Sequence, residues 1–479
     1  MTTVRTRERT SRDQAARPWI LYVVLVVFPL AVTVVLLRFG SEVLGSGEVT
    51  GGRSPGHAVP DVFTDLLLAL PVVLVACQLA GRLFRRISQP GVIGEILAGI
   101  LLGPSVLGLV WPTGYAVLMP QHLLGPLGIL AQLGLIFFMF LVGLELDLRH
   151  VRDSARSLLL ISHSGVAVPM LAGIVLAFAM YEGFAPAHVG FAEFALFFGV
   201  SMSITAFPVL ARIVADRNLK GTLIGTTALA GAAISDITAW CLLAAVVAIV
   251  QQTSFTDVGL TVALTLVFIL FMWRVVRPAL LRSAQDSPQE SSGATVRRLP
   301  DAAVLSLLLC GIMVCALSTQ WIGIHSIFGA FLLGAVMPRG LLTVQRSAFR
   351  IRGVTEVLLL PLFFVYSGLR TELNLLGTDW QQWAWCLLLI VVAVVVKWGS
   401  TTIVARATGF DWPSALSLGA LMNCRGLTEL IVLNVGLDLG VVSPALFTMF
   451  VLMALVSTVM TSPTLSAIDR WVGGGRKQS

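Results

Sequence analysis

The stretch Ala228-Leu-Ala-Gly-Ala-Ala-Ile-Ser-Asp-Ile-Thr-Ala-Trp240 decides the fold, because it places a carboxylate in the middle of an apolar segment. The segment predicted around it, residues 221–251, is long enough to cross a bilayer as a helix. An ionisable side chain at that depth costs about 2.5–3.5 kcal/mol on insertion scales, so Asp236 needs a structural or functional reason. The small residues before it let a neighbouring backbone approach closely.

The composition shows that this segment is one of many. Of the 479 residues, 57% are hydrophobic and 12% are charged, which is about half the charged fraction of a soluble protein. Continuous apolar runs indicate helices, since the strands of a membrane barrel would alternate. We therefore expect an all-α polytopic membrane protein with about fourteen transmembrane helices. They are predicted at 19–38, 62–84, 91–111, 122–145, 156–181, 190–214, 221–251, 258–282, 302–319, 322–338, 354–370, 383–405, 412–436 and 444–467.

The distribution of basic residues predicts the orientation. The formal net charge of +7 does not form a patch of the kind that binds nucleic acid, because arginines and lysines gather in alternate loops. Those loops are predicted to be cytoplasmic by the positive-inside rule, which puts both termini in the cytoplasm of a protein of the cell membrane. The six cysteines show no CxxC or Cys/His spacing and are interpreted as small apolar side chains.

The chain is predicted to divide at its polar segments. The first apolar segment is too long for a signal peptide and is expected to be retained. The predicted parts are a basic cytoplasmic tail (1–18), an extra amino-terminal transmembrane helix (19–40), the first half of the membrane domain (60–282), a cytoplasmic linker (283–300), the second half (301–467) and a short cytoplasmic tail (468–479).

Two predicted spans contain helix-breaking residues. The sixth includes Pro208 after a run of small polar residues, and the thirteenth includes Gly426 beside Arg425. Each is the middle helix of a triplet, within 156–251 and 383–467, and the two triplets start on opposite sides of the membrane. This pattern predicts an inverted repeat with a substrate site between two discontinuous helices.

Asp236 and Lys397 are the two clearest ionisable residues within spans. Asp236 is either a structural carboxylate bonded to backbone or lysine, or a group that alternately holds a proton and a cation. Desolvation of a carboxylate favours its protonated form, which makes that competition possible. Lys397 is expected to pair with Asp236 or with the dipole of a broken helix end, although a long lysine can also reach towards an interface.

Four further residues are supporting candidates. Arg425 and Glu429 are four residues apart on one helix, so a structural ion pair is at least as well supported as a role in transport. Asn423 lies in the same interruption. Glu95 lies about one turn inside its span, where it is either structural or lines an inner vestibule.

Several stretches together resemble the monovalent cation:proton antiporter superfamily, in the branch of the Kef-type and plant cation/H⁺ exchangers. They are Gln89-Pro-Gly-Val-Ile-Gly-Glu-Ile-Leu-Ala-Gly-Ile-Leu-Leu-Gly-Pro-Ser105, Phe138-Met-Phe-Leu-Val-Gly-Leu-Glu-Leu146, Thr205-Ala-Phe-Pro-Val-Leu-Ala-Arg212, Ala232-Ala-Ile-Ser-Asp-Ile-Thr-Ala-Trp240, Gly329-Ala-Phe-Leu-Leu-Gly-Ala335, Leu360-Pro-Leu-Phe-Phe364, Ser367-Gly-Leu369 and Arg425-Gly-Leu-Thr-Glu-Leu-Ile-Val-Leu-Asn434. The resemblance implies a sodium/proton antiporter fold with a dimerisation domain, a core domain with two crossing broken helices, homodimers and elevator-like alternating access.

The resemblance also implies roles for individual residues. Asp236 falls on the ion-binding aspartate, Lys397 on the basic residue of the helix before the second broken one, and Thr205 on the first unwound segment, whose backbone oxygens help to coordinate the ion. Electrogenic members carry two adjacent acids, whereas here Ser235 precedes Asp236. This departure predicts electroneutral exchange, unless Lys397 contributes a second titration. The extra first helix and the absence of a cytoplasmic domain make Kef-type ligand gating a poor expectation.

The leading hypothesis is therefore antiport of Na⁺ or K⁺ against protons, with Asp236 as the shared binding group and no cofactor. The alternatives are a channel-like path for K⁺ efflux and a transporter of organic acids or other small molecules on the same fold. No nucleophile–base arrangement or metal spacing in the sequence suggests an enzyme.

Overall fold

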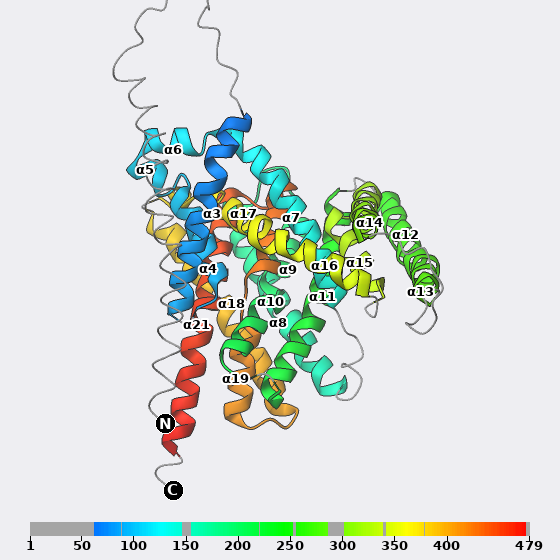
Figure 1. The fold of residues 1–479 in the computed structure, drawn as a ribbon. Coiled ribbons are helices and arrows are strands. Elements are labelled where there is room, and N and C mark those ends of the chain that lie inside the picture. Colours follow the sequence, from blue (N-terminus) through cyan, green and yellow to red (C-terminus); the bar gives the residue numbers. More distant parts are fainter. Residues whose placement is uncertain are drawn as a thin grey trace, which may run out of the picture. The chain divides into compact units, whose positions relative to one another are not determined.

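The computed structural model describes residues 62–87, 89–145, 155–219, 221–251, 255–285, 301–338, 342–377 and 379–475. Every regular element in these residues is helical (Figure 1), which confirms the predicted all-α class. The predicted tail 1–18 and first span 19–40 lie outside the described residues, as does most of the predicted linker.

The helices follow the predicted spans closely. Those before the predicted linker are α3 (Val62–Arg86), α4 (Gly91–Leu102), α5 (Leu107–Val110), α6 (Pro112–Leu118), α7 (Leu124–Glu145), α8 (Ala155–Phe184), α9 (Phe191–Ser203), α10 (Phe207–Asp216), α11 (Leu223–Gln251), α12 (Phe255–Phe271) and α13 (Arg277–Gln285). Those after it are α14 (Asp301–Ile322), α15 (Ser326–Val336), α16 (Leu342–Val354), α17 (Leu360–Leu369), α18 (Trp380–Ala407), α19 (Trp412–Met422), α20 (Leu427–Asp438) and α21 (Pro444–Gly475).

Short irregular turns join some of these helices. A π-helical turn at Met272–Val276 links α12 to α13, and a second at Thr355–Leu359 links α16 to α17. Single 3₁₀ turns lie at Gln121–Leu123 and Leu373–Leu376. Within the described residues, ten helical stretches are long and apolar enough to cross a membrane, and each span predicted from residue 62 onward coincides with a helix or a pair of helices.

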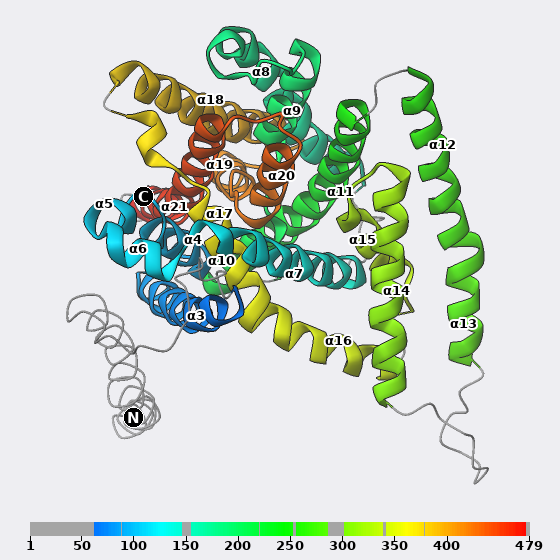
Figure 2. The same cartoon turned by 90° about the horizontal axis from the view of Figure 1, so that it is seen from above.

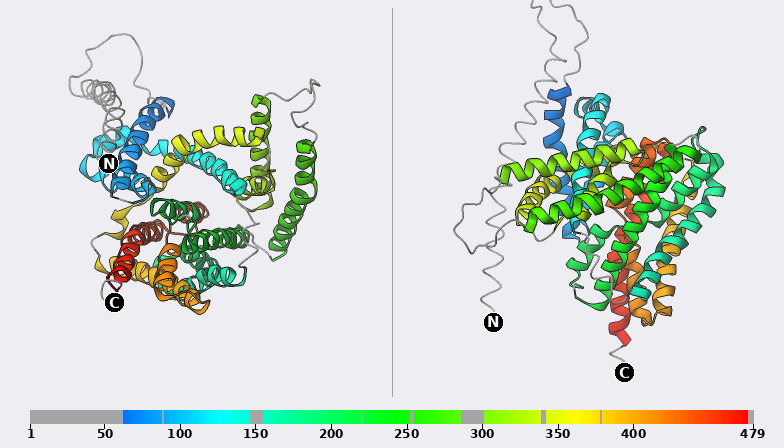
Figure 3. Two further views of the ribbon diagram at one scale, coloured as in Figure 1. Left: turned by 60° about the horizontal axis from the view of Figure 1, so that its bottom comes forward. Right: turned by 90° about the vertical axis from the view of Figure 1, so that its right-hand side faces the viewer.

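The two predicted triplets form one bundle, here named the core bundle, made of α8–α11 and α18–α21. In the first triplet α9 and α10 pack on α11, and in the second α19 and α20 pack on α21. The triplets meet where α8 packs on α18 and α11 packs on α19. Figure 2 shows these helices gathered together, with α3, α4, α7 and α16 beside them, and the left view of Figure 3 shows the same grouping by colour.

Glycines allow the helices around the core bundle to pack at backbone contact. A Cβ at Gly334 of α15 would lie 2.1 Å from the carbonyl oxygen of Phe140 in α7, and a Cβ at Gly143 would lie 2.1 Å from that of Phe331. Close approach through small residues is the usual way in which membrane helices associate, because lipid offers no hydrophobic drive.

The structure differs from the predicted spans in three places. The stretch between the predicted spans 91–111 and 122–145 contains α6. The predicted inner loop after residue 338 contains α16, whose Val344, Ala348 and Ile351 are buried while Arg346 and Arg350 face outward. A helix with one apolar face lacks the continuous apolar run by which spans are recognised. At the other end, α21 runs past residue 467 to Gly475.

The contact between α7 and α15 generates a stability prediction. Gly334→Ala should lower the free energy of unfolding by about 1–3 kcal/mol, because the added methyl overlaps a backbone carbonyl that cannot move alone. The melting temperature of the detergent-purified protein reports the loss. Gly399→Ala in α18 is the matched control, since a Cβ there meets no atom within 4 Å; equal melting temperatures for the two variants would contradict the prediction.

Candidate functional site

The first interruption lies between α9 and α10. The helix ends at Ser203, Ile204 and Ala206 are extended, and α10 begins at Phe207. Pro208 occupies the first turn of α10, where its missing N–H and fixed φ are tolerated. The break predicted at Pro208 is therefore confirmed, and it lies just before the proline.

The second interruption lies between α19 and α20. The helix ends at Met422 and resumes at Leu427. Gly426 has a φ of 157°, a conformation that side-chain-bearing residues rarely adopt. The glycine therefore permits the turn that starts α20, as the sequence predicts.

The two interruptions are bonded to each other. The hydroxyl of Thr205 donates to the carbonyl oxygen of Met422 over 3.2 Å, and the backbone N–H of Ala206 donates to that of Cys424 over 3.0 Å. Residues more than two hundred positions apart in the chain thus satisfy each other's free backbone groups. The predicted crossing of two discontinuous helices is confirmed.

Two cations cap the carboxyl end of α9. The guanidinium of Arg425 donates to the carbonyl oxygens of Ser201 and Met202, at 2.9 and 2.6 Å. The ammonium of Lys397 donates to those of Ser203 and of Ile204, the latter at 2.8 Å. The last carbonyls of a helix have no partner within it and carry partial negative charge, so this is where cations stabilise it. Of the two companions expected for Lys397, the broken helix end is the one to which it donates hydrogen bonds.

Arg425 also pairs with Glu429. One of its nitrogens lies 3.2 Å from each carboxylate oxygen, and neither side chain is exposed. Glu429 lies in the first turn of α20, where the positive end of the helix dipole favours an acid. The spacing of four residues therefore does produce an ion pair, and the pair also links the two triplets through the carbonyls of α9.

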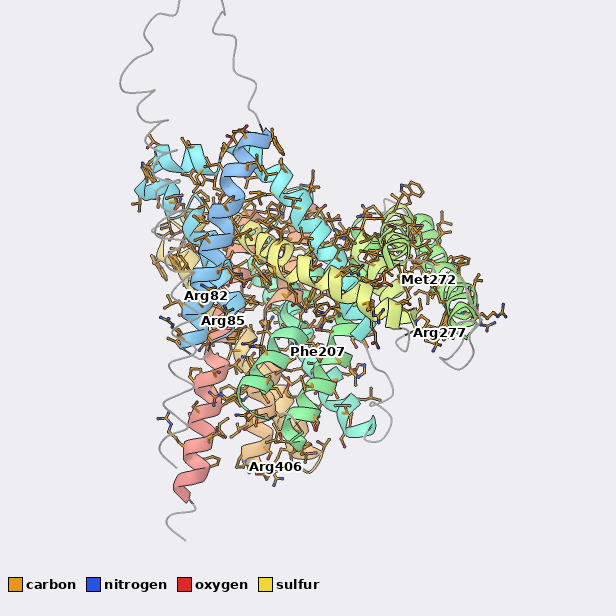
Figure 4. The ribbon with its side chains drawn as sticks, in the orientation of Figure 1. Arg82, Arg85, Phe207, Met272, Arg277 and Arg406 are labelled. Carbon is orange, nitrogen blue, oxygen red and sulfur yellow. The ribbon has the colours of Figure 1, made fainter. Side chains whose placement is uncertain are left out.

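Asp236 lies at the amino end of α10. The backbone N–H of Phe207 donates to its carboxylate, and Figure 4 labels Phe207 at this end of the helix. The side chain is 6% exposed, yet its Oδ1 has no hydrogen-bond partner among the described residues. A buried acceptor without a partner is costly, so this oxygen is a candidate for binding a proton or an ion.

The remaining predicted residues divide into two groups. Asn423 lies in the second interruption, and its Oδ1 is likewise buried without a partner in the described part of the chain. Ser235 turns to α8, where its hydroxyl donates to the carbonyl oxygen of Ser162 over 3.4 Å. Glu95 lies elsewhere, in α4, with its carboxylate close to Gly81 of α3. The structure thus gathers every predicted site residue except Glu95 around the crossing.

Two features of the crossing were not predicted. The hydroxyl of Thr458 in α21 donates to the carbonyl oxygen of Arg425 and accepts from its N–H, which fixes the second interruption on both sides. Thr401, one turn after Lys397, has a buried hydroxyl without a partner among the described residues. The signal in the sequence is weak, because threonine is common in membrane helices and usually bonds its own backbone.

Comparison with known proteins identifies the family. Residues 71–471 match the family described as sodium/hydrogen exchanger, transmembrane. The chain belongs to this family. It is therefore a multi-pass membrane transporter and not an enzyme, and the resemblance inferred from the sequence is confirmed.

Individual relatives agree with the family. The chain is 41% identical over 408 residues to the Na⁺/H⁺ antiporter NhaS4 of Synechocystis sp., covering 84% of this chain and 97% of that protein. It is 40% identical over 427 residues to cation/H⁺ antiporter 20 of Arabidopsis thaliana, covering 87% and 50%. It is 32% identical over 450 residues to K⁺/H⁺ antiporter 1 of Saccharomyces cerevisiae, covering 90% and 50%. The chain thus spans about half the length of the plant and yeast proteins.

A solved structure supports the fold. The sodium/proton antiporter MjNhaP1 of Methanocaldococcus jannaschii superposes with a TM-score of 0.58 at 14% sequence identity, over 84% of this chain and 98% of that one. At this identity the likeness concerns the arrangement of helices alone.

The ion pair at the crossing generates a stability prediction. Arg425→Met should destabilise the protein by about 3–5 kcal/mol, since it leaves the Glu429 charge and two α9 carbonyls buried without their donor. Glu429→Gln should cost clearly less, because Arg425 keeps its two carbonyl acceptors. The melting temperatures of the detergent-purified variants measure both effects.

The double variant completes this test. Arg425→Met with Glu429→Gln should be more stable than the sum of the single losses implies, since no unpaired carboxylate remains. Strictly additive losses, or a larger loss for Glu429→Gln than for Arg425→Met, would refute a shared role at the crossing.

Proposed function

We propose that this protein exchanges a monovalent cation, Na⁺ or K⁺, for protons, and that Asp236 binds each in turn. The observation that carries the proposal is the carboxylate of Asp236, which is buried at the crossing and has one oxygen without a hydrogen-bond partner among the residues that the structure describes. Membership of the sodium/hydrogen exchanger family supports the exchange reaction, and the names of the relatives support both cations.

The chemistry follows from the surroundings of that carboxylate. Away from water, an anion needs a compensating positive charge, and either a proton or a dehydrated cation supplies it. The two compete for the same oxygen, so only one is carried at a time. We propose that Oδ1 of Asn423 and backbone oxygens of the extended segment Ile204–Ala206 complete the ligands of the cation, since oxygen ligands suit hard cations.

Thr205 and Ser235 act by position in this scheme. The hydroxyl of Thr205 holds the first interruption to the second, and that of Ser235 holds α11 to α8. Both therefore keep the oxygens of the site in place while the ion changes.

We propose that Lys397, Arg425 and Glu429 do not bind the transported ion and that their bonds hold them in place beside the site. Both cations are bonded to carbonyl oxygens of α9, so they do not present a free positive surface that would bind an organic anion. This bonding favours a cation substrate over the small-molecule alternative.

Electroneutral exchange follows from this arrangement. With one exchanging carboxylate, a site loaded with H⁺ and a site loaded with Na⁺ or K⁺ carry the same net charge. We therefore propose one proton per cation. If Lys397 also released its proton when the cation binds, two protons would move per cation and the exchange would generate a current.

We further propose the setting in which this exchange operates. The protein lies in the cell membrane with both termini cytoplasmic and forms homodimers, as the resemblance implies. The core bundle carries every proposed ligand, while α3–α7 and α12–α17 lie outside it (Figure 2). This division suits alternating access by movement of the core bundle against the other helices.

The role of Asp236 is tested by Asp236→Asn. The amide cannot exchange a proton, so cation-induced dequenching of a pH-sensitive dye in everted vesicles should fall to the level of empty vesicles for Na⁺ and for K⁺. Glu193→Gln, a carboxylate in the first turn of α9, is the control and should retain exchange. Exchange by a correctly inserted Asp236→Asn protein would reject the assignment.

The stoichiometry is tested in proteoliposomes with a clamped membrane potential. Na⁺-driven proton movement should proceed at the same rate whether the potential is zero or about 100 mV of either sign, because an electroneutral cycle moves no net charge. A rate that rises with potential of one sign would show electrogenic exchange. Cation flux without any proton movement would instead support the channel-like alternative.

A further inference from the structure

An apolar cavity of about 340 Å³ lies beside the proposed ion site and takes no part in it. Its walls come from α11, α12, the end of α14 and α15, and include Ile237, Trp240, Ala245, Leu266, Ile269 and Phe328. Ile237 directly follows Asp236, so one wall of the cavity is the helix that carries the exchanging carboxylate. The volume falls within the range of pockets that hold small ligands.

The lining is almost wholly apolar. The hydroxyls of Thr265 and Thr319 donate to carbonyls of their own helices. The indole N–H of Trp240 is buried and has no acceptor among the described residues, although the side chain is only 4% exposed. Its ring meets Phe328 edge to face, with centroids 6.1 Å apart. An occupant of this cavity should therefore be apolar.

The helix α12 forms the wall that faces lipid. Its Leu266, Val267 and Leu270 are each more than half exposed, which in a membrane helix means contact with hydrocarbon. Leu266 also lines the cavity. The cavity therefore lies next to the lipid that contacts α12, and a lipid chain can enter it from that side.

Arginines follow α12 at one end of the cavity. Arg274 is exposed, and the guanidinium of Arg277 lies over the ring of Trp273, 4.4 Å from its centroid. Figure 4 labels Met272, where the π-helical turn begins, and below it Arg277, the first residue of α13. No ion pair joins either arginine to a described acidic residue. Unpaired arginines at the end of a membrane helix attract anionic lipid head groups.

The π-helical turn aligns Arg277 with the cavity. Eight residues of α-helix after Ile269 would place residue 277 about 80° around the helix from the cavity face. The five π-helical residues Met272–Val276 turn more slowly, which brings Arg277 back towards the face of Ile269 while Met272 stays buried. The guanidinium of Arg277 lies over the ring of Trp273, which follows Ile269 by four residues, so the charge is roughly one helical turn (about 6 Å) beyond Ile269.

We propose that this cavity holds an acyl chain of an anionic phospholipid, with the lipid phosphate at Arg274 and Arg277. The lipid belongs to the leaflet on the side of α13. Since α11 and α12 run antiparallel, the Trp240 end of the cavity is the end that faces the arginines. The acyl chain lies between α11 and α12. It thereby sets how the core bundle contacts the helices beside it.

The test uses purified full-length protein and phosphatidylglycerol with a diazirine in one acyl chain. Light should attach the lipid to residues of α11 and α12 that line the cavity, as located by mass spectrometry. Unlabelled phosphatidylglycerol should compete at least fivefold better than phosphatidylcholine of the same chains, because only phosphatidylglycerol has a net negative charge; fivefold corresponds to the attraction of about one arginine for an anionic lipid. Equal competition by the two lipids would overturn the role of the arginines.

Variants of the protein distinguish the binding of the lipid's acyl chain from the binding of its head group. Ala245→Trp fills the cavity and should reduce labelling at least tenfold; Ala245→Leu, a smaller substitution, should reduce it in the same direction and guards against misfolding. Arg277→Gln should remove the preference for phosphatidylglycerol while labelling by the phosphatidylcholine analogue persists. Arg406→Gln is the control, because Arg406 also lies over a tryptophan ring, that of Trp412 at 5.7 Å, but far from the cavity along the chain.

The remaining outcomes are distinct. Asp236→Asn, which should lack exchange, should bind the lipid like the unaltered protein, so a failure of the proposed exchange leaves this test intact. Undiminished labelling of both Ala245 variants would overturn the proposal. Cavity residues found cross-linked to a second copy of the chain, or to residues 19–38, would assign the cavity to those segments and would also overturn it.

Discussion

The crossing depends on one constraint, which is that the carboxyl end of α9 stops inside the membrane domain with its carbonyls unbonded within the helix. Lys397 and Arg425 donate to four consecutive carbonyls there. Hydrocarbon cannot replace these donors, so each lost bond would leave a buried polar group. The two cations come from α18 and from the second interruption, and the first triplet is therefore completed by the second.

The same constraint explains why acids lie where they do. Asp236 meets the amino end of α10, and Glu429 lies in the first turn of α20. Each acid thus meets the positive end of one half-helix, while the cations meet the negative end of another. Each of these charges would be costly to bury alone, and each is compensated by a helix end of opposite partial charge. The two acids differ, because only Asp236 keeps an oxygen without a partner in the described residues.

The sequence predicted those features that violate the rules of an apolar span. Asp236 and Lys397 are conspicuous because they are ionisable, and Pro208 and Gly426 because they interrupt a helix. Features that do not disturb the apolar pattern of a span were not predicted from the sequence. The arginine-bearing helix α16 resembles a loop when only apolar runs are counted, and Thr458 is a neutral residue whose partner, Arg425, lies in the distant second interruption. Glu95 was ambiguous because position within a span does not reveal which neighbour a side chain meets.

The bonds between the interruptions have a mechanical consequence. Thr205 and Ala206 are tied to Met422 and Cys424, and Thr458 ties Arg425 to α21. Bending either half-helix by itself would break several of these ties at once, in a medium that offers no substitute. The ligands must then move together as one rigid unit. The movement needed for transport has to occur at the boundary of the core bundle, where polar ties such as the Arg370–Asp438 ion pair and the bond from Asn434 to Ser367 would have to break and re-form.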